Sequence, residues 1–192
     1  MFAADVESLG TDQNSVLLSV GIVYFNPSVN PTQDELFENS IFVKFDVKEQ
    51  VKEYHRVMNK STMEWWNKQC DIVKRKSFNP SHNDLSLEHG INNLRAWIKK
   101  FPEYHKDFVW TRGGMDEAIL DDVCVNNLGT EVLFEYNKYR DFRTAISILY
   151  NSTNGYAEIE NESYDDSKIY KHSPVDDCVL DIMQLLYGKE KE

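Results

Sequence analysis

The first part of the chain has the hydrophobic pattern of β-strands. Residues 2–7 form a short segment that is apolar at its start, and residues 16–25 form a β-branched apolar run closed by the turn signal Asn26-Pro27. In residues 37–47 apolar and polar positions alternate, which is typical of a half-exposed strand. We therefore expect three strands in succession.

The rest of the chain has mainly the period of amphipathic helices. Ser61 and Glu64 form a capping box at the start of one short helix. The pattern predicts further helices over 85–101, 116–128, 143–150 and 176–187, strands over 107–111 and 132–136, and a polar loop or lid over 151–171. This order predicts an α/β domain with helices on a mixed five-stranded sheet. No linker divides the chain, so we expect a single domain over 1–192.

Composition narrows the functional classes. The 192 residues include 21 Lys+Arg and 32 Asp+Glu, a formal charge of −11, and 41% are hydrophobic. The longest apolar run is about half the roughly 20 residues that a membrane span needs, and no secretory signal is recognisable, so we expect a cytoplasmic protein without a membrane partner. Cys70, Cys124 and Cys178 form no CxxC pair. The acidic balance disfavours nucleic-acid binding by basic charge alone, unless carboxylates hold divalent cations.

Four acidic residues at three sites in the chain could form such a cluster. Asp5 and Glu7 are two residues apart and point to the same face of a strand; Asp116 lies where a strand meets a helix; Asp177 follows His172 by five residues in the first turn of a helix. Each acid alone has a structural explanation, such as a solvated strand end or a helix cap. Together they offer the roughly four carboxylates that two divalent ions require. Oxygen ligands favour Mg²⁺ or Mn²⁺.

This ordered set resembles the signature of the DEDDh 3′–5′ exonucleases, which have a ribonuclease-H-like fold. Segments 16–27, 41–46, 61–66 and 140–144 also resemble the exodeoxyribonucleases of T-even-type phages, and the similarity covers most of the chain. The same segments are more weakly similar to a mycobacterial exoribonuclease. The resemblance implies an enzyme of the host cytoplasm if the chain is phage-encoded, and it leaves DNA or RNA open as the substrate.

The resemblance also implies a role for each matching residue. Asp5 would bridge two Mg²⁺ or Mn²⁺ ions, Glu7 and Asp177 would complete the ion site on the side of the nucleophile, and Asp116 would hold the ion near the leaving group. His172 would be the general base that takes a proton from the attacking water, a task that suits an imidazole.

Two further expectations concern the substrate and the third motif. By the same resemblance, Ser8, Leu9 and Gly10 would approach the terminal nucleotide through backbone amides and an apolar wedge. The spacing from His172 favours Asp177 over its neighbour Asp176 as the third-motif acid.

We therefore expect a 3′–5′ exonuclease that acts on the 3′ end of single-stranded DNA and releases nucleoside 5′-monophosphates. One alternative is a 3′–5′ exoribonuclease acting on RNA ends. A protein of another class, an acidic mimic of nucleic acid, would use the negative charge itself as its binding surface. Trp65 and Trp66 are adjacent, so we expect one in the core and the other at least partly exposed, with stacking on a nucleobase as a secondary role.

Overall fold

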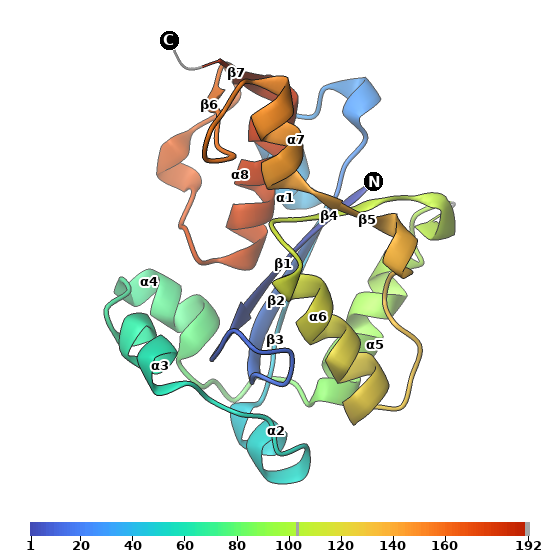
Figure 1. Ribbon diagram of the computed structural model, residues 1–192, viewed down its shortest axis with the longest axis vertical. Helices are drawn as coiled ribbons and strands as arrows, with labels where there is room; N and C mark the ends of the chain where they lie inside the picture. Colours follow the sequence, from blue (N-terminus) through green and yellow to red (C-terminus); the bar gives the residue numbers. More distant parts are fainter. Residues whose placement is uncertain (103, 191–192) are drawn as a thin grey trace.

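A mixed five-stranded sheet forms the centre of the computed structural model, which describes residues 1–102 and 104–190. The central strand β1 (Phe2–Ser8) is antiparallel to β2 (Leu17–Tyr24), which is antiparallel to β3 (Ser40–Lys44). On its other side β1 is parallel to β4 (Val109–Thr111), and β4 is parallel to β5 (Tyr139–Asp141), giving the order β3-β2-β1-β4-β5. This sheet confirms the α/β class and the mixed five-stranded sheet expected from the sequence (Figure 1).

Helices surround the sheet. They are α1 (Gln33–Glu38), α2 (Val47–Glu53), α3 (Lys60–Asn67), α4 (Asp71–Val73), α5 (Leu87–Ile98), α6 (Met115–Asp122), α7 (Phe142–Leu149) and α8 (Pro174–Tyr187). A second, two-stranded sheet pairs β6 (Glu158–Ile159) with β7 (Gly188–Lys189). Within the described residues, no helix combines the length and the apolar character that a membrane crossing requires.

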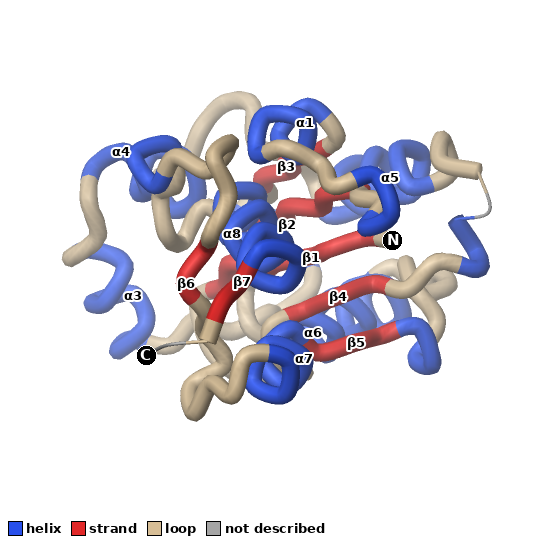
Figure 2. The backbone as a smooth tube through the Cα atoms, turned by 90° about the horizontal axis from the view of Figure 1, so that it is seen from above, coloured by secondary structure: helices blue, strands red, loops and turns tan. Residues whose placement is uncertain are grey.

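The two faces of the sheet are covered by different helices. Side chains from α5 and α6 pack on one face, and side chains from α1, α7 and α8 pack on the other. Figure 2 shows the strands as one layer with helices on both sides. Along β1, Ala4 and Val6 enter the core beneath α5 and α6, whereas Ala3 enters the core beneath α8. Because successive side chains of a strand alternate, Asp5 and Glu7 lie on the α8 face.

The predicted strand over 37–47 is shorter than expected at both ends. Residues 37 and 38 belong to α1, whose capping box joins Thr32 and Glu35, and the strand begins only at Ser40. At the other end, the Asp46 carboxylate accepts from two backbone N–H groups of the next turn and starts α2 at Val47. Local capping thus takes both ends of the alternating run into helices.

The predicted strand over 132–136 is wrong. This segment has no strand partner among the described residues, and the fifth strand is Tyr139–Asp141. The Arg95 guanidinium donates to the carbonyls of Glu131 and Val132, at 2.8 and 3.4 Å, while Phe134 is buried in the core. A side chain from α5 therefore takes hydrogen bonds that a neighbouring strand would otherwise make.

The predicted helix near Ser61 exists, but its N-cap residue lies two positions earlier than expected. Asn59 is the N-cap of α3, and its side-chain oxygen accepts from the N–H groups of Ser61 and Thr62. The capping box expected from Ser61 and Glu64 is therefore not formed. Between α4 and α5, a π-helical turn over Lys74–Phe78 was not expected from the sequence.

Candidate active site

The end of β1 carries the first two acids of the site. Asp5 lies opposite Gly21 of β2, and Glu7 lies opposite Ser19. A Cβ atom at Gly21 would come within 2.5 Å of the Pro174 backbone, so the absence of a side chain lets the start of α8 pack directly on β2. This close approach places the first turn of α8 over Asp5 and Glu7.

Asp116 reaches the same place from the strand on the other side of β1. Strand β4 ends at Thr111 and pairs only with the first half of β1. The chain then turns through Gly113, which has a φ of +100° and donates its N–H to Asp141 at 2.9 Å. Helix α6 starts at Met115, so Asp116 lies in its first turn with a relative exposure of 5%. Its carboxylate lies beside the second half of β1, on the side that β4 leaves unpaired.

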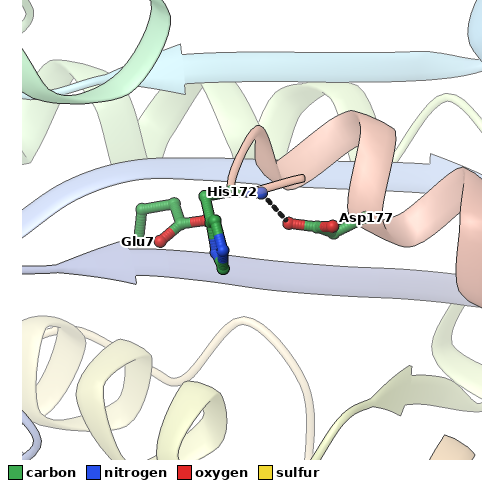
Figure 3. A group of neighbouring side chains, drawn as sticks. All are labelled: Glu7, His172 and Asp177. Carbon is green, nitrogen blue, oxygen red and sulfur yellow. Dashed lines mark hydrogen bonds between the residues drawn. The ribbon is translucent and has the colours of Figure 1, made fainter. Parts of the chain in front are cut away.

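Asp177 and His172 come from the start of α8 and the loop before it. The Asp177 carboxylate accepts a hydrogen bond of 2.7 Å from the backbone N–H of His172. His172 has a left-handed φ of +68°, which turns its backbone N–H toward Asp177. One ligand atom from each of Glu7, His172 and Asp177 lies within 4.8 Å of the others. Figure 3 shows the His172 ring between the carboxylates of Glu7 and Asp177.

The sequence-predicted acids interact electrostatically as one group. Burial raises the pKa of Asp5 and Glu7 well above their ordinary values, and the neighbouring carboxylates raise both further. Burial likewise raises the pKa of Asp116 and of Asp177 to about 7, although hydrogen bonds from backbone N–H groups oppose this. The structure therefore brings Asp5, Glu7, Asp116 and Asp177 together, as the sequence predicted.

The donor set fits hard divalent cations. One carboxylate oxygen of Asp5, Oδ2, is buried and has no hydrogen-bond partner among the residues that the structure describes. Such an atom is costly in a folded protein unless something positive pairs with it. The other available donors are carboxylate oxygens and one imidazole, and oxygen-rich sites of this kind suit Mg²⁺ or Mn²⁺. A bound cation would also remove the repulsion that raises these pKa values.

A fifth carboxylate, Asp181, was missed in the sequence. It lies one helical turn after Asp177 on α8, has a relative exposure of 7%, and raises the pKa of Asp5, Asp116 and Asp177 through its charge. Arg112 pairs with it through Nε and Nη2 at 2.6 to 3.0 Å. The i, i+4 spacing from Asp177 could have indicated Asp181 in the sequence, but no sequence pattern indicates its distant partner Arg112. Arg112 is thus held in an ion pair behind the site.

Arg112 also connects the site to the polar loop. Its Nη1 donates to the Gly155 carbonyl at 2.9 Å, and its guanidinium lies over the Tyr156 ring, 4.2 Å from the ring centroid. The side chain therefore joins β4, α8 and the start of the 151–171 segment. That segment contains β6 and a short 3₁₀ turn, but is otherwise irregular, in agreement with the expected loop.

A groove of about 410 Å³ lies beside Glu7. Its walls include Ser8 and Gly10 of the predicted substrate segment, Trp65 of α3, and Met115 before Asp116. Leu9 does not line it: the side chain is 3% exposed and packs in a small core. The Leu9 N–H bonds the Val16 carbonyl at 2.8 Å, so neither the expected wedge nor this amide faces the groove.

The two adjacent tryptophans divide as expected. Trp66 is buried at 1% relative exposure and donates from Nε1 to the Ser8 carbonyl, whereas Trp65 is 40% exposed. The Trp65 ring meets the His172 ring edge-on, with centroids 4.6 Å apart. Trp65 therefore lines the groove and contacts the histidine. The adjacency of the two tryptophans predicted that one of them is exposed, but not which one.

Comparison with known proteins agrees with this site. The family model described as the 3′–5′ exoribonuclease Rv2179c-like domain matches residues 1–185, almost the whole chain. The chain belongs to this family. It is thus a 3′–5′ exonuclease by family, and the resemblance noted in the sequence is confirmed.

Two individual proteins extend the comparison. An exodeoxyribonuclease of Enterobacteria phage T4 is 30% identical over 204 residues, covering 97% of this chain and 88% of the phage protein. A crystal structure of the nuclease domain of 3′hExo, described as a DEDDh family member bound to rAMP, matches with a TM-score of 0.59 at 9% identity, covering 96% and 88% of the two chains. The second match supports the ribonuclease-H-like fold.

Proposed function

We propose that the protein is a metal-dependent 3′–5′ exonuclease that removes nucleoside 5′-monophosphates from the 3′ end of single-stranded DNA. The observation that carries the proposal is the convergence of Asp5, Glu7, Asp116 and Asp177 around one point, with His172 beside them. A nucleic-acid mimic would need dense exposed charge, and has no use for mutually repelling carboxylates held in a partly buried cluster around an imidazole.

Two divalent ions, Mg²⁺ or Mn²⁺, are the proposed cofactors. Asp5 would bridge them, Glu7 and Asp177 would complete the site nearer the attacking water, and Asp116 would hold the ion nearer the leaving group. The ions, when bound, would supply an activated water and charge stabilisation of the leaving oxygen. The Oδ2 atom of Asp5, which has no hydrogen-bond partner among the described residues, is free to bind such a cation.

His172 is the proposed general base. Burial lowers the pKa of its imidazole below the ordinary value, and the charge of Lys171 lowers it further. The ring is therefore neutral at physiological pH and can accept a proton from water. Its backbone bond to Asp177 holds it next to the acids that would bind the ion on the nucleophile's side.

The groove beside Glu7 is the proposed site of the terminal nucleotide. The exposed face of Trp65 offers a surface on which a base can stack, and stacking tolerates any base, which suits an exonuclease without sequence preference. DNA is favoured because the phage relative is an exodeoxyribonuclease. RNA is the second candidate, because the family model is described as an exoribonuclease domain.

Digestion of 5′-labelled single-stranded DNA and RNA of identical sequence tests the proposal. Each strand is incubated with Mg²⁺, Mn²⁺ or EDTA, and an Asp177→Asn protein prepared in parallel exposes contaminating nuclease. We expect a ladder that shortens from the 3′ end, more rapidly on DNA, and no products with EDTA or with the variant. A faster reaction on RNA would favour the second candidate, and no cleavage of either strand would contradict the exonuclease function.

Metal-free protein is expected to lose stability as the pH rises. The pKa values of Asp116 and Asp177 are about 7 in the folded state, against an ordinary value of 3.8 for an aspartate side chain. Between these values the folded state holds more protons than the unfolded state, so the free energy of unfolding falls with increasing pH. Mn²⁺ binds the ionised cluster, and at about 100 times its Kd should raise the melting temperature by roughly 5–10 °C at pH near 7.5.

Thermal melts at pH near 5 and near 7.5, with EDTA or MnCl₂, measure both effects. Asp177→Asn is the control, because it removes one of the titrating carboxylates and one proposed ligand. We expect a flatter pH dependence and a smaller Mn²⁺ shift in this variant. An Mn²⁺ shift equal to that of the wild type would contradict the assignment of Asp177 as a ligand.

A further inference from the structure

Two adjacent carboxylates fasten the loop that carries His172. Asp177 accepts from the His172 N–H at 2.7 Å, and Asp176 accepts from the Tyr170 N–H at 3.0 Å. Asp177 belongs to the acidic cluster. Asp176, at 4% relative exposure, makes its contacts with a different part of the chain, so that the two neighbouring acids hold one loop from two sides.

The partner of Asp176 is Lys76, from the π-helical turn after α4. The Lys76 ammonium lies 3.2 and 3.4 Å from the two oxygens of the Asp176 carboxylate and 3.4 Å from the Ser173 hydroxyl. It also lies over the Tyr170 ring, 5.1 Å from its centroid. The aspartate side chain is only 5% exposed, whereas that of the lysine is 41% exposed. A buried carboxylate is thus neutralised by a cation that reaches it from a more exposed position.

The residue after Lys76 contacts the histidine itself. The Ser77 hydroxyl donates to the His172 carbonyl at 3.3 Å, and Ser77 is fully buried. The same turn therefore makes contact with the loop on both sides of Ser173, through a charge at Lys76 and through a hydroxyl at Ser77. Neither contact involves an acid of the proposed metal site.

The segment that supplies Lys76 and Ser77 packs against a residue in the wall of the nucleotide groove. Phe78 stacks on Trp66 with ring centroids 5.7 Å apart, and Trp66 is joined to Ser8 through its indole N–H. Trp65, next to it, lines the groove and touches the His172 ring. The groove wall and the anchor of the histidine loop are therefore one packed unit.

We propose that Lys76 and Ser77 are positioning residues that hold His172 at the acidic cluster, through Asp176 and through the His172 carbonyl. The inference rests on the proposed function, in which His172 is the base. If the Lys76–Asp176 ion pair had only a structural role, breaking it would lower the free energy of unfolding and leave kcat unchanged. A pair that positions the base must change kcat while substrate and metal binding stay the same.

The test compares Lys76→Met, Asp176→Asn and the double variant with the wild type. Methionine keeps an unbranched side chain without the charge, and asparagine keeps an oxygen that can accept from the Tyr170 N–H. Lys168→Met is the matched control, because Lys168 forms an exposed ion pair with Asp34 and borders the same loop. The measurements are kcat and KM on labelled single-stranded DNA, Mn²⁺ affinity, and hydrogen exchange of the 168–177 backbone.

We expect Lys76→Met and Asp176→Asn each to lower kcat by about 10- to 100-fold, the usual effect of losing a group that orients a functional side chain. KM and Mn²⁺ affinity should stay near wild type, and exchange in 168–177 should become faster. The double variant should have the same kcat as the less active of the two single variants, because both changes break the same Lys76–Asp176 contact. Lys168→Met should behave as the wild type.

The outcomes separate this inference from the proposed function. Wild-type kcat and wild-type exchange in Lys76→Met, with the wild type active, would overturn the positioning role and leave the exonuclease function standing. A lower melting temperature with unchanged kcat would also overturn it. An inactive wild type would instead contradict the proposed function, and the exchange measurement would still show whether Lys76 holds the loop.

Discussion

Replacing Asp177 by asparagine is expected to lower kcat by about 10²- to 10³-fold, the size of effect seen when a group that stabilises transition-state charge is removed. Asparagine can still accept the hydrogen bond from the His172 N–H, so the loop should keep its conformation while the cluster loses one charge. The fold should survive, because removing one of several repelling carboxylates relieves strain rather than creating it. Steady-state kinetics with Mg²⁺ and with Mn²⁺ measure the loss, and circular dichroism checks the fold.

Asp176→Asn provides the internal comparison for this prediction. The two acids are neighbours, Asp176 buried and Asp177 partly buried, but only Asp177 lies in the cluster. We expect Mn²⁺ affinity to fall in Asp177→Asn and to stay unchanged in Asp176→Asn. The opposite result, with metal binding lost only at Asp176, would overturn the assignment of the third motif.

Replacing His172 by asparagine is expected to lower kcat by about 10²- to 10⁴-fold, the usual contribution of a general base. Asparagine is the appropriate substitute because His172 has a φ of +68°, a conformation that asparagine tolerates better than alanine does. The backbone N–H that donates to Asp177 is retained. Mn²⁺ affinity, measured by calorimetry, should therefore remain near that of the wild type while the chemical step slows.

The pH dependence of kcat supplies a second measurement on the same variant. A general base acts in its neutral form, and the pKa of His172 is lowered from 6.5 by burial and by Lys171. Wild-type kcat should therefore decrease only at pH values lower than about 6.5, where the ring becomes protonated. This fall should be absent in His172→Asn. A variant with normal kcat would rule out the role of base.

The acids of the site were predictable because their spacing corresponds to simple geometry. Residues two positions apart on a strand point to the same face of the sheet, and Asp5 and Glu7 both lie on the α8 face. Asp116 and Asp177 each stand in the first turn of a helix, and helix starts are readable from a preceding glycine turn or a proline. The same periodicity predicted the central sheet, since apolar runs such as β2 are buried along nearly their whole length.

Features that depend on contacts between distant residues were not predictable. Arg112 and Asp181 are 69 positions apart and have no common pattern in the sequence. The segment near Phe134 has the alternation of a strand, but Arg95 binds its carbonyls. Leu9 is apolar beside a polar site, a pattern that fits a wedge as well as a core residue, and only packing decides between them. Each error concerns tertiary context rather than local preference.

The pairing of β6 with β7 has a consequence for how this fold can diverge. Strand β7 follows α8 directly, and the Glu160 N–H donates to the Tyr187 carbonyl at the end of this helix. The segment from β6 to His172 therefore starts at the C-terminal end of α8 and returns to its N-terminal end, where His172 contacts Asp177. The 14 residues of α8 span about 21 Å, a distance that the segment must cover in every descendant. Gln33 fastens it once more, at Asp165. Insertions can therefore accumulate in the exposed turn over Asp166–Lys168 without moving His172, and evolution can lengthen the loop there while the chemistry stays in place.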